Sequence, residues 1–170
     1  MASEEAPTEQ HAIARDLAEE VRGVCLGMRV ARLHRIVARV YEQALQTVGL
    51  SLPQMEILTT LISATGPVKP TALARTLMLE RSTVSRNLAL MKERGWVTVE
   101  ETSPTGRAMS VTITDAGLAA FTSASTAWRS AQTTAAEILG SAASSMLDQW
   151  LGLDADEPAP PKRQRNAWPR

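Results

Sequence analysis

The spacing of apolar residues between positions 70 and 113 constrains this chain more than any other feature. Up to Gly95 the spacing is helical, and two short helices are predicted. Pro70 occupies a typical first helical position and opens the first of them, and Gly95 ends the second, which spans about 81–94. This second helix carries Val84, Leu88 and Met91 on one face.

After Gly95 the apolar residues alternate with polar ones in two runs, at 97–100 and 109–113. The stretch between them, TSPTGR, is rich in turn-forming residues, so the two runs predict a β-hairpin. Two short helices joined by a tight turn and followed by a hairpin form a helix-turn-helix with a wing.

Long helical patterns flank this unit. We predict one continuous helix from about Asp16 to Val48, a helix over about 52–63 begun by a capping box of Ser51 and Gln54, and a helix over 115–138 capped by Thr114. A last helix follows Gly140. The predicted organisation is a flexible acidic N-terminus (1–15), a dimerisation helix (16–50), a winged helix-turn-helix domain (51–114), C-terminal dimerisation helices (115–153) and a flexible basic tail (154–170). The fold class is therefore mainly α with a β-hairpin wing.

The formal net charge is zero, but the charges are segregated. Residues 1–20 contain six acidic residues and one basic residue, whereas residues 22–107 contain twelve basic and six acidic residues. A net positive middle segment is typical of a surface that meets phosphates. Double-stranded DNA is the predicted partner.

The N-terminal turns of the 81–94 helix carry the side chains expected to read bases. Small hydroxyls approach base edges closely, while Arg86 and Asn87 suit bidentate contacts to guanine and adenine. Other basic side chains and Thr71 are expected along the DNA backbone, and Arg107 at the hairpin tip suits a narrow minor groove. The full predicted set is Lys69, Thr71, Arg75, Arg81, Ser82, Thr83, Ser85, Arg86, Asn87, Lys92 and Arg107.

The run LERSTVSRNLALMKERGWV, the preceding KPTALARTL and the downstream VTITDAG resemble the multiple antibiotic resistance regulator (MarR) family. The resemblance covers about residues 22–151. It implies a homodimer that binds a pseudo-palindromic operator, most often as a repressor, and that is released by a small aromatic or hydrophobic effector or by thiol oxidation. It also implies base reading by Ser82, Thr83, Ser85 and Arg86, and a wing-tip contact by Arg107. The acidic residue that often accompanies that arginine is replaced here by Thr105 and Gly106.

Other classes of protein fit less well. One cysteine and two histidines do not make a usual zinc site, no apolar run approaches the length of a membrane span, and the acidic start is unlike a secretory signal. We expect a cytoplasmic protein without metal, cofactor or catalytic residues. An enzyme with Cys25 as nucleophile would need a base within reach, and His34 lies nine residues further on. A winged helix used only for protein contacts is the main alternative, which Arg86, Asn87 and Lys92 disfavour.

Four features of the sequence each allow two roles. Cys25 is either a redox sensor or a small apolar side chain. Arg32, Arg35 and Arg39 form either a solvated face or part of an effector or DNA site. Phe121 and Trp128 line a ligand site or pack in the core. The tail KRQRNAWPR contacts DNA nonspecifically or serves only solubility.

Overall fold

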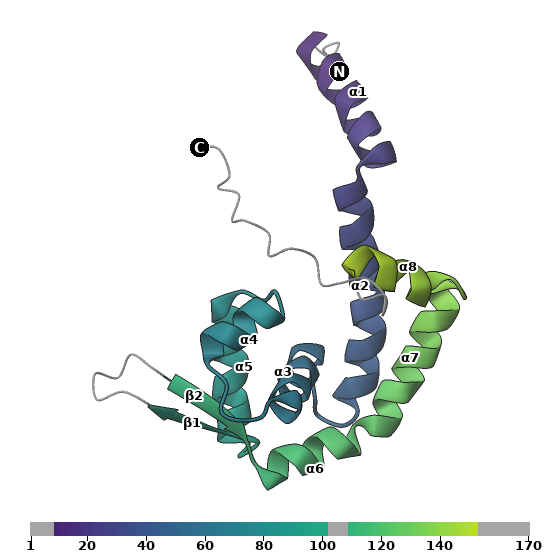
Figure 1. Ribbon diagram of the computed structural model, residues 1–170. Helices are drawn as coiled ribbons and strands as arrows, with labels where there is room; N and C mark the ends of the chain where they lie inside the picture. The colour runs from purple at the N-terminus through teal and green to yellow at the C-terminus, as the bar shows by residue number, and fades with distance from the viewer. Residues whose placement is uncertain (1–8, 102–108, 153–170) are drawn as a thin grey trace, which may run out of the picture.

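A computed structural model describes residues 9–101 and 109–152 (Figure 1). The described residues form helices and one hairpin: α1 (Glu9–Val24), α2 (Leu26–Gln46), α3 (Leu52–Ser63), α4 (Pro70–Thr76), α5 (Arg81–Glu93), β1 (Val97–Glu101), β2 (Met109–Ile113), α6 (Asp115–Ser123), α7 (Ser125–Leu139) and α8 (Ala143–Leu151). The predicted fold class is confirmed. The wing tip with Arg107, residues 1–8 and the tail from 153 lie outside the described residues.

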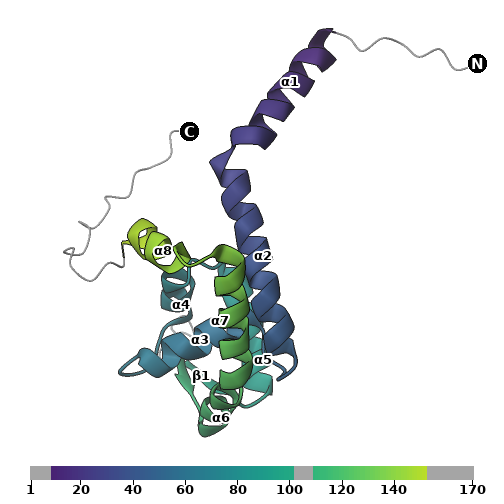
Figure 2. The same ribbon diagram turned by 90° about the vertical axis from the view of Figure 1, so that its right-hand side faces the viewer.

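The hairpin, α4 and α5 gather on one side of α3, and α2 and α7 run side by side on the other (Figure 1). The Tyr41 hydroxyl on α2 donates a hydrogen bond to Gln132 on α7. Figure 2 shows α1 leaving the body as an extension of α2. The fold thus consists of a compact reader domain, from α3 to β2, and two helical arms formed by α1–α2 and α6–α8.

One apolar core holds the reader domain together. It takes buried residues from the end of α2, from α3, α4, α5, both strands and the junction of α6 with α7. Val84, Leu88 and Met91 of α5 are at most 5% exposed, as their spacing predicts. Burying each of these side chains stabilises the fold by about 1.5–3 kcal/mol, so the opposite face of α5 is fixed toward solvent.

Local signals in the sequence account for the helix boundaries in this domain. Ser51 and Gln54 form the predicted capping box, and α3 spans residues 52–63 as expected. Pro70 opens α4, and Gly95 follows α5 with a φ of +71°, a conformation that glycine adopts without strain. Where such signals are present, the boundaries are therefore predictable to within about a residue.

The hairpin is antiparallel, with Val97 opposite Ile113 and Val99 opposite Val111. An additional pairing was not predicted: Val68, just before α4, exchanges two backbone hydrogen bonds with Val111, at 2.9 and 2.8 Å. This isolated bridge attaches the start of α4 to the second strand of the wing. It fixes the position of the wing relative to the helix-turn-helix.

The prediction of one continuous helix over residues 16–48 was wrong. Helical structure begins at Glu9, is interrupted at Cys25 and ends at Gln46. Cys25 has an extended ψ of 110° and is flanked by Gly23 and Gly27, which lower the helix propensity of this stretch. Residues 9–15, predicted to be flexible, are helical because they are mostly good helix formers with Glu9 in the first turn.

The predicted helix over residues 115–138 is likewise divided in two. Thr114 caps α6 as expected, accepting a hydrogen bond from the Gly117 amide at 3.1 Å. The helix is interrupted at Ala124, within the hydroxyl-rich run TSAST. Thr122 and Ser123 donate their hydroxyls to backbone carbonyls one turn earlier, a pattern that bends helices.

Candidate nucleic-acid interface

Helix α5 presents its polar N-terminal turns to solvent. Arg81, Ser82, Ser85 and Arg86 are exposed, whereas Thr83 and Asn87 are half-buried. The side chains that face outward are therefore two arginines and two small hydroxyls. A helix with small side chains at this end can approach the floor of a groove closely, and its free backbone amides favour a negatively charged partner.

Two side chains on this face already bond within the helix. The Arg86 Nε donates to the Ser82 carbonyl at 3.2 Å, and the Asn87 Nδ2 donates to the Thr83 carbonyl at 2.9 Å. For Arg86 this bond orients the guanidinium and uses only one of its five N–H groups. Asn87 is half-buried and engages its amide nitrogen, so it is less accessible than the sequence suggests.

A polar hollow of about 820 Å³ lies between α4 and the N-terminus of α5. It brings together five residues of the predicted set: Lys69, Thr71, Arg75, Arg81 and Ser82. All five are exposed. Glu80 also lines the hollow and is its one acidic residue, so the lining carries a net positive charge.

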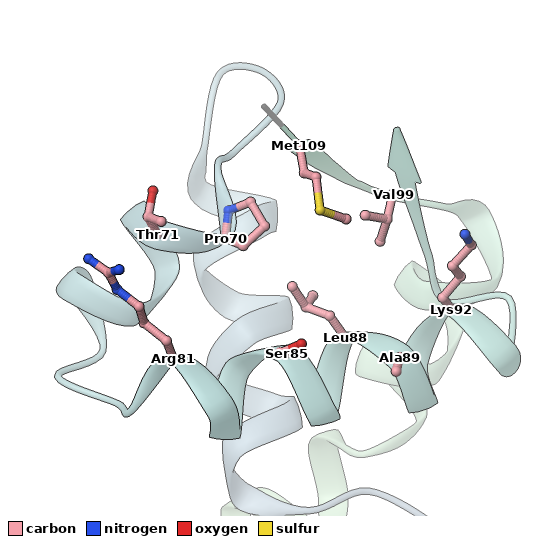
Figure 3. Close-up of a pocket in the computed structure, with 9 residues that line it drawn as sticks. All are labelled: Pro70, Thr71, Arg81, Ser85, Leu88, Ala89, Lys92, Val99 and Met109. Carbon is pink, nitrogen blue, oxygen red and sulfur yellow. The ribbon is translucent and has the colours of Figure 1, made fainter. Parts of the chain in front are cut away.

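A second hollow, of about 380 Å³, lies between α5 and the hairpin (Figure 3). Pro70, Leu88, Val99 and Met109 converge on its centre from α4, α5 and the two strands. Its polar residues lie around this apolar centre: Arg81 and Lys92 are at opposite ends of α5, Ser85 lies between them, and Thr71 is on α4 on the same side as Arg81. The sequence gives no signal for this hollow, because its walls are apolar residues that only the fold brings together.

The structure thus places seven of the predicted residues around two adjoining hollows: Lys69, Thr71, Arg75, Arg81, Ser82, Ser85 and Lys92. Three further predicted residues of α5 line neither hollow: Thr83, Arg86 and Asn87. Arg107 lies outside the described residues. Cys25 is half-buried at the junction of α1 and α2, on an arm rather than in the reader domain.

The residues for which the sequence allows two roles lie outside these two hollows. Arg32, Arg35 and Arg39 line a hollow on α2 alone. Phe121 packs against the core, and Trp128 is 39% exposed beside it; both line a further hollow between α3 and the junction of α6 with α7. Of the two alternatives, core packing thus describes Phe121, whereas Trp128 lies at the edge of the hollow.

Two side chains with raised pKa values, Tyr41 and Glu56, lie where α2 meets α3 and α7. Burial raises the pKa of Glu56; Glu42 raises this pKa further and His34 opposes the shift. Burial also raises the pKa of Tyr41. Within the described ranges, no three His, Cys, Asp or Glu side chains are grouped as metal ligands, and no helix there is long and apolar enough to cross a membrane.

Comparison with known proteins gives a consistent assignment. Residues 48–108 match the model of the MarR family. The transcriptional regulator MosR of M. tuberculosis, solved in complex with DNA, is 26% identical, with a TM-score of 0.63 over 76% of this chain and 93% of that one. No curated protein matches the sequence.

Two more distant structures share the fold. A single-residue mutant of MarR from E. coli, complexed with operator DNA, is 18% identical, with a TM-score of 0.66 over 78% of this chain and 95% of that one. BpsR of Bordetella bronchiseptica, whose DNA binding is described as regulated by 6-hydroxynicotinic acid, is also 18% identical, with a TM-score of 0.66 over 77% and 98%.

Proposed function

We propose that this chain, which carries a MarR-family winged helix-turn-helix over residues 48–108, is a repressor that binds an inverted-repeat operator as a homodimer. The observation that carries the proposal is the division of α5 into a buried face and an exposed one. Val84, Leu88 and Met91 anchor the helix, so the side carrying Ser82, Ser85 and Arg86 is turned to solvent. The DNA complexes of MosR and of E. coli MarR support the assignment.

In this proposal α5 enters the major groove with its N-terminal half. Arg86 reads a guanine by a bidentate contact, and the hydroxyls of Ser82 and Ser85 allow close approach to base edges. Phosphates occupy the polar hollow between α4 and α5, beside Lys69 and Arg75. The bridge from Val68 to Val111 holds the wing at a fixed distance from α5, so helix and wing engage DNA together.

Unpaired apolar surface on the arms supports the homodimer. Helix α1 buries none of its residues, and Ile13, Leu17 and Val21 follow one another at helical spacing with 62%, 59% and 41% of their surfaces exposed. Trp150 and Leu151 of α8 are also more than 60% exposed. A second copy of the chain would cover these surfaces, and its two-fold axis would place the two α5 helices about 34 Å apart, one turn of DNA.

The apolar hollow beside α5 is the effector site in this proposal. Its volume of about 380 Å³ suits a small aromatic molecule, with Arg81, Ser85 and Lys92 available to an acidic group. A molecule bound there would occupy space between the reading helix and the wing, and would therefore compete with DNA. That BpsR is regulated by 6-hydroxynicotinic acid supports an effector of this chemical class.

The DNA-binding proposal is tested by selecting duplexes from a random pool and titrating them by fluorescence anisotropy at several salt concentrations. We expect an enriched inverted repeat and affinity that falls steeply with salt. Arg86→Ala should weaken operator binding by about 10–100-fold, corresponding to about 1–3 kcal/mol for a lost bidentate contact. The matched control, Arg129→Ala, removes an exposed arginine of α7 and should bind normally. Absence of an enriched repeat refutes the function.

The effector proposal is tested with 6-hydroxynicotinic acid and other aromatic carboxylates as probes. We expect at least one of them to release the operator. Met109→Trp fills the hollow from the wing, so the fraction of operator that this variant binds should no longer fall when the acid is added. Release that persists in Met109→Trp places the effector elsewhere, with the hollow beside Trp128 as the next candidate.

A further inference from the structure

Both helical arms attach to one short segment, Arg94 to Trp96, which directly follows α5, and each arm bonds to different residues of it. From the first arm, Gly49, which follows α2, accepts a hydrogen bond on its carbonyl from Arg94 Nη1 at 2.5 Å. From the second arm, Thr114, which begins α6, donates its hydroxyl to the Gly95 carbonyl at 2.6 Å and its amide to the Trp96 carbonyl at 3.1 Å. We refer to residues 94–96 as the α5 joint.

Arg94 is exposed and bonds to its arm through its side chain, whereas Gly95 and Trp96 bond through their backbone carbonyls. Its guanidinium carbon lies 4.8 Å from the centre of the Trp96 ring, so the same group stacks on the start of the wing and bonds to the end of α2. A planar guanidinium can donate from its edge while its face stacks on an aromatic ring. Because Arg94 is outside the apolar core, its contacts orient the elements more than they bury surface.

From this geometry we infer that Arg94 is a positioning residue that sets the spacing of operator half-sites. The inference rests on the proposed function. Together with the buried end of α2, the Arg94 side chain holds the first arm, which belongs to the proposed dimer, against the reader domain, which carries α5. If the angle between arm and reader domain is fixed, the dimer binds half-sites at one spacing. If this angle can vary, the dimer binds half-sites at several spacings.

The length of α5 shows how sensitive the spacing is to this angle. The helix has thirteen residues, so it is about 20 Å long, and its reading residues lie at the end opposite the joint. If the reader domain pivots at the joint by about 10°, the reading end moves by about 3.5 Å, which is close to the rise of one base pair. A small change of angle at Arg94 therefore moves the reading end of one subunit about as far as one base pair extends along the DNA axis.

The test uses the full-length chain and duplexes in which the selected half-sites are moved apart or together by one and two base pairs. Two inserted base pairs turn one half-site by about 70° relative to the other. We expect wild-type affinity to fall at least about tenfold on these duplexes. Arg94→Ala should lose less than about threefold on the duplexes changed by one base pair, while discriminating between correct and mutated half-site bases as the wild type does.

Arg39→Ala is the matched control. Arg39 of α2, Gly49 and Arg94 line another hollow, of about 400 Å³, and the loss of Arg39 removes the same charge from this hollow as the loss of Arg94. No hydrogen bond joins it to Gly49 in the described part of the chain. We expect Arg39→Ala to keep the wild-type dependence on spacing, whatever its overall affinity.

Arg94→Lys addresses the possibility that Arg94→Ala does not fold. Lysine keeps the charge but cannot stack a planar face and donate from its edge, so this variant should also tolerate altered spacing. A folded Arg94 variant with the full wild-type penalty on every altered spacing overturns the inference while leaving the proposed function intact. A wild-type protein that binds no inverted repeat overturns both.

Discussion

Gly117→Ala tests whether close packing or local helix propensity dominates where the second arm meets the reader domain. Gly117 lies in the first turn of α6, and a Cβ there would lie 2.2 Å from the Trp96 carbonyl oxygen and 2.8 Å from Ile113 Cγ1. Propensity alone predicts that alanine stabilises a helix by about 0.5–1 kcal/mol relative to glycine. Packing predicts the opposite sign, because the nearest atom belongs to the backbone and cannot rotate away.

The expected cost follows from the contacts around Gly117. Overpacking a well-filled site costs about 1–3 kcal/mol. Moving α6 away to relieve the clash would also stretch the hydrogen bonds from Thr114 to the Gly95 and Trp96 carbonyls, each worth about 0.5–1.5 kcal/mol. We therefore expect Gly117→Ala to reduce the free energy of unfolding by about 2–4 kcal/mol.

The assay is urea unfolding followed by circular dichroism, at one fixed protein concentration because a dimer's stability depends on concentration. Gly66→Ala is the control: a Cβ at this position would meet nothing within 4 Å, and the φ of Gly66 is not in the left-handed range. It should change stability by less than about 1 kcal/mol, in the stabilising direction. If Gly117→Ala is as stable as Gly66→Ala, the close approach of α6 to Trp96 is wrong.

Three further changes probe the helix ends and one half-buried carboxyl. Met78→Gly should stabilise the protein by about 0.5–1 kcal/mol in thermal unfolding, because Met78 is 91% exposed and has a φ of +53°; Met78→Ala, which keeps the strain, should not. Ser51→Ala should cost about 1 kcal/mol in urea by removing the capping box with Gln54. Burial raises the pKa of Glu56, so the folded state holds its proton more tightly and stability falls as the pH rises from the unfolded pKa through the folded one. Glu56→Gln should therefore be more stable than wild type at pH 7, with the difference disappearing as the pH falls below the unfolded pKa; a constant difference across pH would contradict this.

The sequence predicts the reader domain better than the arms, and the difference has a physical cause. Boundaries such as those at Ser51, Pro70 and Gly95 depend on neighbouring residues, so the signal is local. The helices on either side of Cys25 and of Ala124 keep nearly the same spacing of apolar residues. A prediction from this spacing therefore joins the two helices into one. Glycines at 23 and 27 and hydroxyls at 122 and 123 are the signals that could have indicated them.

The candidate site divides in the same way. Which side of α5 is exposed follows from Val84, Leu88 and Met91, and the sequence predicts it correctly. The apolar hollow and the bridge from Val68 to Val111 depend on residues from separate elements, and no sequence spacing indicates them. In the sequence, Arg94 is like any basic residue near the C-terminal end of a helix. Only the fold brings it to Gly49, from which it is 45 residues distant in the chain.

The two ends of α5 have different tasks, and their residues differ accordingly. At the N-terminal end Arg81, Ser82, Ser85 and Arg86 are exposed, which suits contact with a surface that is not part of the protein. At the C-terminal end, backbone carbonyls of Gly95 and Trp96 and the side chain of Arg94 are engaged by both arms. Because Val84, Leu88 and Met91 fix α5 within its domain, a change in arm angle at the joint displaces the proposed reading residues together with that domain. An effector in the hollow beside Leu88 and a change at the joint would therefore act on the same helix by different routes, the first by occupying the DNA surface and the second by moving it.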